Sequence, residues 1–290
     1  MPDITGPVNA AEVDFQNSRI SNLEYSIQPL SYNFLNSLIT VIDLLAPYKA
    51  DCDLVRIGNY SDGGYVVATE KPGHAKRCIN LGVGYEISAD LHLLGLGYQI
   101  LAIDGTVENP LPENQQYFFI KSSIGYSREK SGYESLRTIR RRNNWKGKVD
   151  LFLIDIEGFE YEFLEREWKE IMSSRQVVIE FHGLELMGDE IFSNRLVKIL
   201  KKIRTTHKVI QIHGNNAGPA IPTGGASWPT ILEVTFLQNS EVSGDRNFGP
   251  FPGVLDAPNT TKRPDINLQP FFSTEPSYAL LTRKILESSR

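Results

Sequence analysis

The stretch NLGVGYEISADLHLLGLGYQILAIDG, residues 80–105, decides the fold class of this chain. An apolar run that ends at Leu81 predicts a strand, residues 87–97 predict a helix that ends at glycine, and QILAIDG predicts a second strand. Gly82 and Gly84 lie in the turn between the first strand and the helix. This β-α-β pattern predicts a parallel sheet with a ligand site at its first turn.

The alternation of predicted strands and helices continues to about residue 240. Strands made almost entirely of Val, Ile, Leu and Phe are typical of a parallel sheet with helices on both faces. The last two predicted strands, 207–216 and 229–239, have no helix between them and are expected to form a hairpin. We therefore predict an α/β fold with a mostly parallel, seven-stranded sheet and one antiparallel strand.

The chain is expected to have three parts. Residues 1–75 contain a polar arm, an amphipathic helix that begins near Ser31, and a β-hairpin around SDGG. Residues 76–240 form the ligand-binding domain. Residues 241–290 are expected to form a proline-rich lid and a short final helix that pack on the same domain.

Composition excludes several classes of function. With a formal net charge of −5 over 290 residues, general attraction to nucleic acid is not expected. The basic run Arg137–Lys148 is interpreted as a solvated helix end, with a phosphate or glycan contact as the alternative. Cys52 and Cys78 are too few for a disulfide framework or a four-cysteine zinc site.

The sequence contains no apolar run long enough to span a membrane, and its N-terminus has no features of a secretory signal. We therefore expect a cytoplasmic protein without a membrane span. The amphipathic helix after Ser31 is expected either to cover the sheet or to pair with a second subunit, so a homo-oligomer is one expectation.

Several polar residues follow the predicted strands, at the sheet edge where open α/β folds bind ligands. Gly82 and Gly84 either form a tight turn or let the backbone approach an adenosine-bearing ligand. A dinucleotide fingerprint requires a third glycine where this chain has Ile87. Asp104, before Gly105, either accepts hydrogen bonds from a ribose or is a turn residue. Together these features favour a nucleoside cofactor without a diphosphate.

The chain resembles the S-adenosylmethionine-dependent methyltransferases of the FkbM type in NLGVGYEISADL, LAIDG, DLFLIDIEGFEYEFL, VVIEFHG, HGNNAG and ILEVTF. RIGNYSDGGYVV is similar to the segment before the fold in part of that group. The resemblance covers roughly residues 53–240. It implies a Rossmann-like methyltransferase fold, S-adenosylmethionine as cofactor, and O-methylation of a sugar, glycan or natural product.

The resemblance also bears on Asn80, because methyltransferases commonly carry an acidic residue two positions before the first glycine. The amide of Asn80 is expected to contact the methionine portion of the cofactor. Asp62, in the turn of the hairpin, is expected either to be a turn residue or to reach the cofactor from there.

Methyl transfer from a sulfonium requires an acceptor oxygen in line with the methyl group and removal of its proton. Asp155 and Glu157 follow one strand and point to the same side, so a cation, a shared proton or a substrate hydroxyl is expected between them. Glu157 has helix capping as its alternative. Asp155 either orients the acceptor or the cofactor's amino group, or binds Mg²⁺ or Mn²⁺ with His182 or Glu180 and with Asn215.

His182 is the predicted general base because an imidazole titrates near neutral pH, and His213 is the rival candidate. Asn215 and Asn216 are expected either to orient substrate hydroxyls or to turn the chain. The aromatic residues after position 216 are expected to pack in the core or lid, or to stack on a sugar. A non-catalytic nucleoside-binding or scaffold protein of the same fold is the alternative function.

Overall fold

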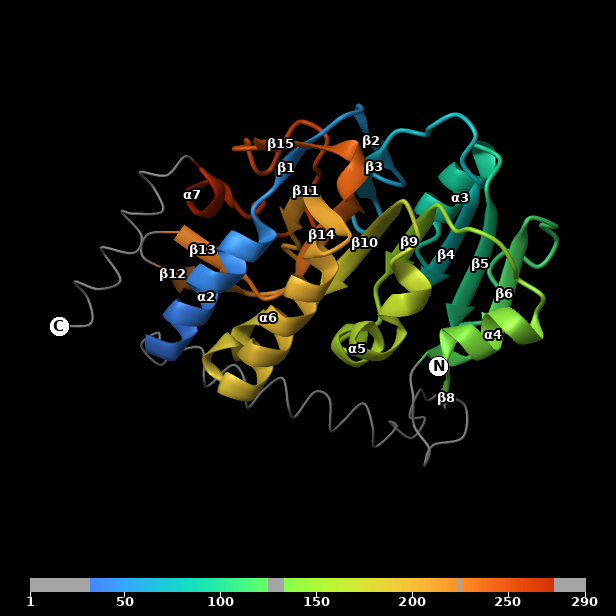
Figure 1. Cartoon of the computed structure of the whole chain (residues 1–290), viewed down its shortest axis with the longest axis horizontal. Coiled ribbons are helices and arrows are strands. Elements are labelled where there is room, and N and C mark those ends of the chain that lie inside the picture. The colour runs from blue at the N-terminus through green and yellow to red at the C-terminus, as the bar shows by residue number, and fades with distance from the viewer. Residues whose placement is uncertain (1–31, 125–132, 224–225, 274–290) are drawn as a thin grey trace, which may run out of the picture.

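The computed structural model describes residues 32–124, 133–223 and 226–273, and its centre is a seven-stranded sheet (Figure 1). The strands lie in the order β11-β14-β10-β9-β4-β5-β6. Their bounds are β4 (Arg77–Leu81), β5 (Gln99–Asp104), β6 (Tyr117–Lys121), β9 (Leu151–Ile154), β10 (Gln176–Phe181), β11 (His207–Gly214) and β14 (Leu232–Gln238). β14 is antiparallel to β10 and β11, and the other neighbours are parallel. The predicted sheet is confirmed.

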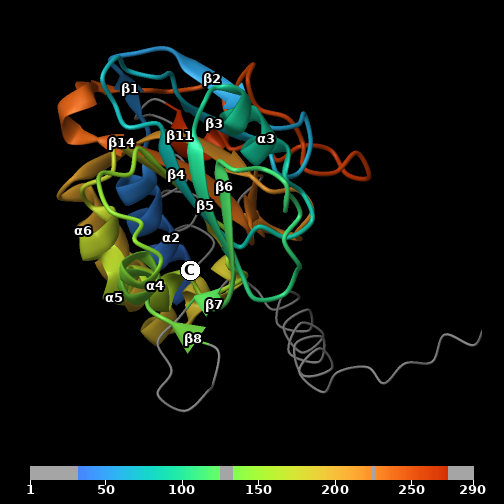
Figure 2. The same ribbon diagram turned by 90° about the vertical axis from the view of Figure 1, so that its right-hand side faces the viewer.

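Helices cover both faces of the sheet (Figure 2). One face carries α2 (Tyr32–Leu45), α4 (Leu136–Arg142), α5 (Glu160–Ile171) and α6 (Glu190–Arg204), and the other carries α3 (Ser88–Gly95). β9 and β10 are buried at every position, because a strand between two covered faces has no solvent side. Within β9, Phe152 packs in the cluster under α2, α5 and α6, and Leu153 packs in the cluster under α3.

The N-terminal part of the described chain is joined to this core. The predicted hairpin is present as β2 (Leu54–Ile57) and β3 (Tyr65–Ala68), which pair antiparallel. α2 packs against α6 and the short helix η1 (Leu184–Gly188) with its apolar side chains buried, so it covers the chain's own helices. β1 (Tyr48–Ala50) pairs with β15 (Val242–Arg246), which joins the N-terminal part of the described chain to its C-terminal part.

The C-terminal part adds a second hairpin, β12 (Ala220–Thr223) and β13 (Ala226–Pro229), and two short helices, η2 (Asn239–Glu241) and α7 (Gln269–Phe272). Trp228 packs edge-on against Phe271 with 5.1 Å between ring centroids, and Phe251 packs against Phe272 at 6.0 Å. These rings form a core, as one of the expectations had it. The predicted N-terminal arm and final helix lie outside the described residues, and the lid and the three-part division stay predictions.

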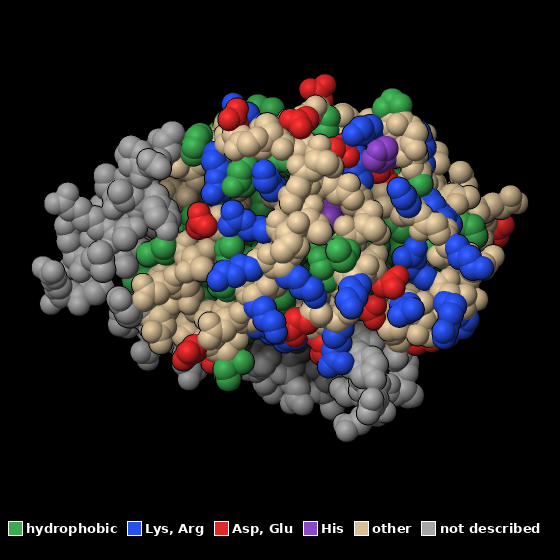
Figure 3. Space-filling view, in the orientation of Figure 1, with side chains coloured by type: hydrophobic (Ala, Val, Ile, Leu, Met, Phe, Trp, Pro, Cys, Tyr) green, Lys and Arg blue, Asp and Glu red, His purple; other side chains and the backbone are tan. Residues whose placement is uncertain are grey.

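The basic run after residue 136 lies on α4 and the loop that follows it. Ser135 caps α4 by accepting a hydrogen bond from the Thr138 backbone, and Arg140 forms an ion pair with Glu170 at 3.2 Å. Lysine and arginine side chains gather on the molecular face that carries α4 and α6 (Figure 3). β7 (Ser123–Ile124) and β8 (Tyr133–Glu134) form a small parallel pair near α4. Among the described helices, none has the length and apolar character needed to cross a bilayer.

Candidate functional site

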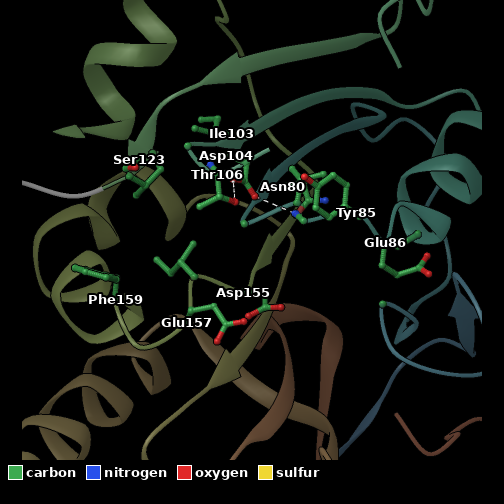
Figure 4. Close-up of a pocket in the computed structure, with 18 of the residues that line it drawn as sticks. Asn80, Tyr85, Glu86, Ile103, Asp104, Thr106, Ser123, Asp155, Glu157 and Phe159 are labelled. Carbon is green, nitrogen blue, oxygen red and sulfur yellow. Dashed lines mark hydrogen bonds between the residues drawn. The ribbon is translucent and has the colours of Figure 1, made fainter. Parts of the chain in front are cut away.

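A cavity of about 440 Å³ lies at the carboxyl ends of β4, β5 and β9 (Figure 4). The chain continues from β4 to β5 on one side of the sheet centre, whereas β9 is added on the other side. This is the switch point at which open α/β sheets bind their ligands. The six residues predicted to bind a cofactor all line the cavity: Asn80, Gly82, Gly84, Asp104, Gly105 and Asp62.

Gly82 lets the tips of β4 and β9 meet. Its φ of +81° is a conformation that favours glycine, and a Cβ placed on it would overlap the carbonyl oxygen of Asp155. The backbone N–H of Asp155 donates to the carbonyl of Leu81 at 2.9 Å. The first glycine of the motif therefore fixes the position of Asp155 at the edge of the cavity.

Asp104 organises the turn on the β5 side of the cavity. Its Oδ2 accepts a hydrogen bond from the Gly84 N–H at 2.9 Å, and its Oδ1 accepts two from Thr106, each at 2.6 Å. Burial alone would raise the pKa of Asp104, but the hydrogen bonds from Thr106, Gly84 and Val107 hold it below the ordinary value. The carboxylate is therefore ionised and is an acceptor on the cavity wall.

The wall beside Asp104 includes residues that the sequence analysis missed. Thr106, Ser122 and Ser123 line the cavity, and a Cβ on Gly105 would overlap the hydroxyl of Ser123. These residues follow β5 and β6, so the strand-end rule could have drawn attention to them. Their hydroxyl groups make this side of the cavity polar without adding charge.

Four carboxylates surround the imidazole of His182, which follows β10. Its Nε2 lies 3.7 Å from Asp155 Oδ1, 3.6 Å from Glu157 Oε2 and 3.6 Å from Glu180 Oε1, and its Nδ1 lies 3.5 Å from Glu160 Oε1. Burial alone would lower the pKa of His182, but the carboxylates, Glu160 foremost, raise it to about 9. At neutral pH the ring is an imidazolium, which has no lone pair to accept a proton.

Asp155 has the opposite protonation behaviour. Burial raises the pKa of its carboxyl to about 7; His182 opposes the shift, whereas Glu157 adds to it. The Oδ1 atom is buried and receives no hydrogen bond from any residue that the structure describes. In Figure 4, Asp155 and Glu157 lie side by side at the cavity. A carboxyl group that lines the cavity and titrates near neutral pH can accept a proton.

Glu160 was missed by the sequence analysis, which treated it as an ordinary helix residue. Its side chain is fully buried; Oε1 accepts a hydrogen bond from the His182 backbone at 2.7 Å, and Oε2 accepts one from the Gly158 backbone at 2.8 Å. Glu157, just before, has a φ of +53°, which is uncommon for a residue with a side chain. The sequence did contain a signal for the burial of Glu160, because this residue lies between the aromatic residues Phe159 and Tyr161.

Tyr65 on β3 also lines the cavity. Burial and then the charges of Asp155 and Glu180 raise its pKa far above the ordinary value. Its phenol therefore keeps its proton and is a hydrogen-bond donor beside the acidic group.

Three other predicted residues lie elsewhere, and none of them lines the cavity. His213 lies between Glu233 and Asp265, with each ring nitrogen 3.0 Å from a carboxylate oxygen. Asn215 donates to Glu180 and accepts from the Ala217 backbone, both at 2.8 Å. Asn216 holds the C-terminal segment through the carbonyl groups of Thr260, Arg263 and Pro264. Among the described residues, these polar atoms satisfy one another within the protein.

The predicted metal ligands are brought together only in part. Asp155 and His182 each offer a ligand atom, and Glu157 offers a third, all within 4.8 Å of one another. The amide of Asn215 is turned away into its bonds with Glu180 and Ala217. Two carboxylates and an imidazole suit Mg²⁺ or Mn²⁺, so the group that fits a cation is Asp155, Glu157 and His182.

Comparison with protein families identifies the class of protein that this fold and cavity define. The methyltransferase FkbM domain matches residues 49–207, which is more than half of the chain. The chain therefore belongs to the FkbM methyltransferase family. Its α/β sheet is the Rossmann-like fold of S-adenosylmethionine-dependent methyltransferases, and the predicted family and fold are confirmed.

Solved structures show similarity to this chain at low identity. A TehB-like S-adenosylmethionine-dependent methyltransferase from Corynebacterium glutamicum is 12% identical, with 80% of this chain and 100% of that chain covered and a TM-score of 0.34. A Streptococcus mutans protein described as a methyltransferase, in complex with SAH, is 10% identical, with 73% and 99% covered and a TM-score of 0.32. A chain of a fibrillarin/Nop5p complex is 14% identical, with 57% of this chain and 77% of that chain covered and a TM-score of 0.37. Comparison with curated proteins gave no significant match.

Proposed function

We propose that this methyltransferase is an O-methyltransferase that transfers the methyl group of S-adenosylmethionine to a hydroxyl of a sugar, glycan or natural product. The observation that carries the proposal is the carboxyl of Asp155, which lines the cavity with its side chain 32% exposed and whose pKa is raised to about 7. A hydroxyl acceptor requires a base at that place.

The cofactor is proposed to lie across the tips of β4 and β5. Its ribose hydroxyls donate to Oδ2 of Asp104, and the backbone turn at Gly82 and Gly84 lies along the nucleoside. The adenine is proposed to lie toward Gly105 and Ser123, and the methionine portion toward Asn80. This direction places the sulfonium between the β4 tip and Asp155.

In the proposed reaction, the acceptor oxygen attacks the methyl carbon in line with the sulfur. The O–C bond forms as the C–S bond breaks, and the bonding pair leaves with sulfur as a neutral thioether. The proton of the hydroxyl passes to the carboxylate of Asp155. Alignment and proton removal together account for the rate, because the sulfonium is already a good leaving group.

His182 has a different role in this proposal from the one expected from sequence. Its imidazolium lies among Asp155, Glu157, Glu160 and Glu180 and offsets part of their charge. Without that cation, the pKa of Asp155 would rise further, because His182 opposes the upward shift. We propose Asp155 as the base and His182 as the residue that sets the pKa of Asp155. The proposal assigns no catalytic part to His213.

A divalent cation is the competing partner for the same carboxylates. Asp155, Glu157 and His182 would hold it, and its charge would lower the pKa of a bound acceptor hydroxyl. Dialysis against a chelator, followed by addition of Mg²⁺ or Mn²⁺, distinguishes the two possibilities. Activity that is lost with the chelator and restored by the metal would favour the cation over proton transfer to Asp155 alone.

The acceptor is proposed to be neutral. Asp62, Asp155, Glu157 and Glu180 lie at or beside the cavity, and an anionic group placed there would be repelled. The proposed acceptor is a small molecule or glycan met in the cytoplasm, and nucleic acid is not expected because the chain has a net negative charge.

A homo-oligomer would need a surface other than the buried face of α2.

The test is methyl transfer in vitro. The purified protein, S-adenosylmethionine with an isotope-labelled methyl group, and a panel of neutral sugars and hydroxylated natural products are analysed by mass spectrometry. We expect label on oxygen in at least one acceptor, and labelling that is slower by about 100-fold or more with Asp155→Asn. Label on nitrogen or carbon would contradict the proposal. Calorimetry with S-adenosylmethionine and with NAD tests the cofactor, and binding without transfer to any acceptor would favour the scaffold alternative.

A further inference from the structure

A buried carboxylate lies directly behind the cofactor cavity. Asp90 on α3 has no exposed surface, and its Oδ1 accepts a hydrogen bond from Nδ2 of Asn80 at 2.9 Å. Its Oδ2 accepts one from the hydroxyl of Tyr117 on β6 at 3.1 Å. Asn80 itself lines the cavity, whereas Asp90 does not. The carboxylate is thus held from β4 and β6 and reaches the cavity only through the Asn80 amide.

This contact determines which end of the Asn80 amide faces the cavity. A primary amide has a donor end and an acceptor end of similar shape, and either can point in a given direction. An ionised carboxylate only accepts hydrogen bonds, so Asn80 must turn its NH₂ group toward Asp90. Its Oδ1 is then the end of the amide that remains for a ligand in the cavity that Asn80 lines.

We propose that Asp90 is a positioning residue that orients the Asn80 amide, so that Asn80 Oδ1 accepts a hydrogen bond from the α-ammonium group of S-adenosylmethionine. The inference rests on the proposed function, because it takes the methionine portion of the cofactor to lie over the β4 tip. In this chain β4 carries the neutral side chain of Asn80 at the cavity wall. The negative charge belongs to Asp90 on α3, which lies behind Asn80 and is hydrogen-bonded to it.

The cost of burying this charge supports a role in binding. Burial raises the pKa of Asp90 to about 6, against the opposing hydrogen bonds from Asn80 and Tyr117, so the group is mostly ionised at neutral pH. An ionised carboxylate with only neutral partners is a costly feature for a core. A cation in the cavity adds the favourable charge interaction that these partners lack, transmitted through the polarised amide.

The test compares two ligands that differ in the amino-acid portion. S-adenosylmethionine carries the α-ammonium, whereas methylthioadenosine keeps the nucleoside and sulfur and lacks it. We expect Asp90→Asn to weaken binding of S-adenosylmethionine about tenfold or more, as measured by calorimetry, and to change methylthioadenosine binding by less than about threefold. Tyr117→Phe, which removes the other partner of Asp90, is the matched control and should change neither by more than about threefold.

A double variant exchanges the two side chains. Asn80→Asp with Asp90→Asn returns the carboxylate to β4, and we expect it to recover S-adenosylmethionine binding to within about threefold of wild type. The inference would be overturned if Asp90→Asn weakened binding of both ligands equally, or if it bound S-adenosylmethionine as tightly as wild type does. If the double variant does not fold, the ratio of the two dissociation constants measured for Asp90→Asn is enough to decide. A wild-type protein that binds neither ligand would instead overturn the proposed function.

Discussion

Gly82 at the end of β4 lies against the backbone carbonyl of Asp155, which follows β9, and no side chain can occupy the space between them. The contact joins the turn that is expected to hold the cofactor to the residue proposed to take the acceptor's proton. The two halves of the reaction are therefore placed relative to each other by backbone packing, before any ligand is bound.

Replacing Gly82 by alanine should damage both stability and binding. The Cβ would overlap Asp155, and alanine would also have to adopt a φ of +81°. We expect a loss of about 3 kcal/mol or more in the free energy of unfolding, measured by urea denaturation, with S-adenosylmethionine binding lost. Gly95→Ala is the control, because that glycine has free space around it and no positive φ. A Gly82→Ala protein as stable as wild type would contradict the packing described here.

Asp155→Asn should separate catalysis from cofactor binding. The amide has nearly the same shape as the carboxyl but cannot act as a base, so we expect kcat to fall by about 100-fold or more. The dissociation constant for S-adenosylmethionine should change by less than about threefold, because the hydrogen bonds proposed to hold the cofactor come from Asp104 and Asn80. Glu157→Gln is the matched control: its side chain is 69% exposed, and its effect on kcat should be much smaller.

The dependence of the methyl-transfer rate on pH should reflect the titration of Asp155 and His182. Because Asp155 must be ionised to accept a proton, kcat should rise with pH through about 7, where its carboxyl titrates. Above about 9 the His182 imidazolium is lost, so a second change in rate is expected there. Since these groups interact, the profile reports values for the group as a whole. A wild-type rate that does not rise as the pH passes through about 7 would rule out Asp155 as the base.

His213 should affect stability rather than catalysis. Burial alone would lower its pKa, but the hydrogen bonds with Asp265 and Glu233 raise it to about 10, against 6.5 for a free histidine. The folded state therefore binds this proton more tightly than the unfolded state. The resulting stability is fully present below pH 6.5 and is lost as pH rises through about 10.

This effect is measured by urea denaturation at a series of pH values. We expect the free energy of unfolding of wild type to fall between about pH 6.5 and 10. His213→Gln should lose the part of this dependence that His213 contributes and keep the part from His182, whose pKa is also raised. The variant should keep its dependence of kcat on pH near 7, because His213 does not line the cavity. A loss of that dependence in His213→Gln would return His213 to the list of candidate bases.

Much of the fold could be predicted because its signals are local. Apolar runs such as those of β9 and β10 need only their own residues to indicate strands buried on both sides. The same holds for one side of the cavity, where Gly82 directly follows β4, Gly84 lies in the same turn, and Asp104 ends β5. The rule that ligands bind at the carboxyl ends of the strands needs only the alternation of strands and helices along the chain.

The sequence by itself determined the sheet, the family resemblance and the strand ends that line the cavity, because each depends on residues near one another in the chain. Only the tertiary structure decided the raised pKa values of His182 and Asp155, and the partners that keep His213 and Asn215 away from the cavity. These depend on charges and hydrogen bonds between distant segments, such as His213 with Asp265. The pKa of a residue and its hydrogen-bond partners depend on its neighbours in space. When those neighbours are far away in the sequence, the sequence pattern around the residue does not identify them.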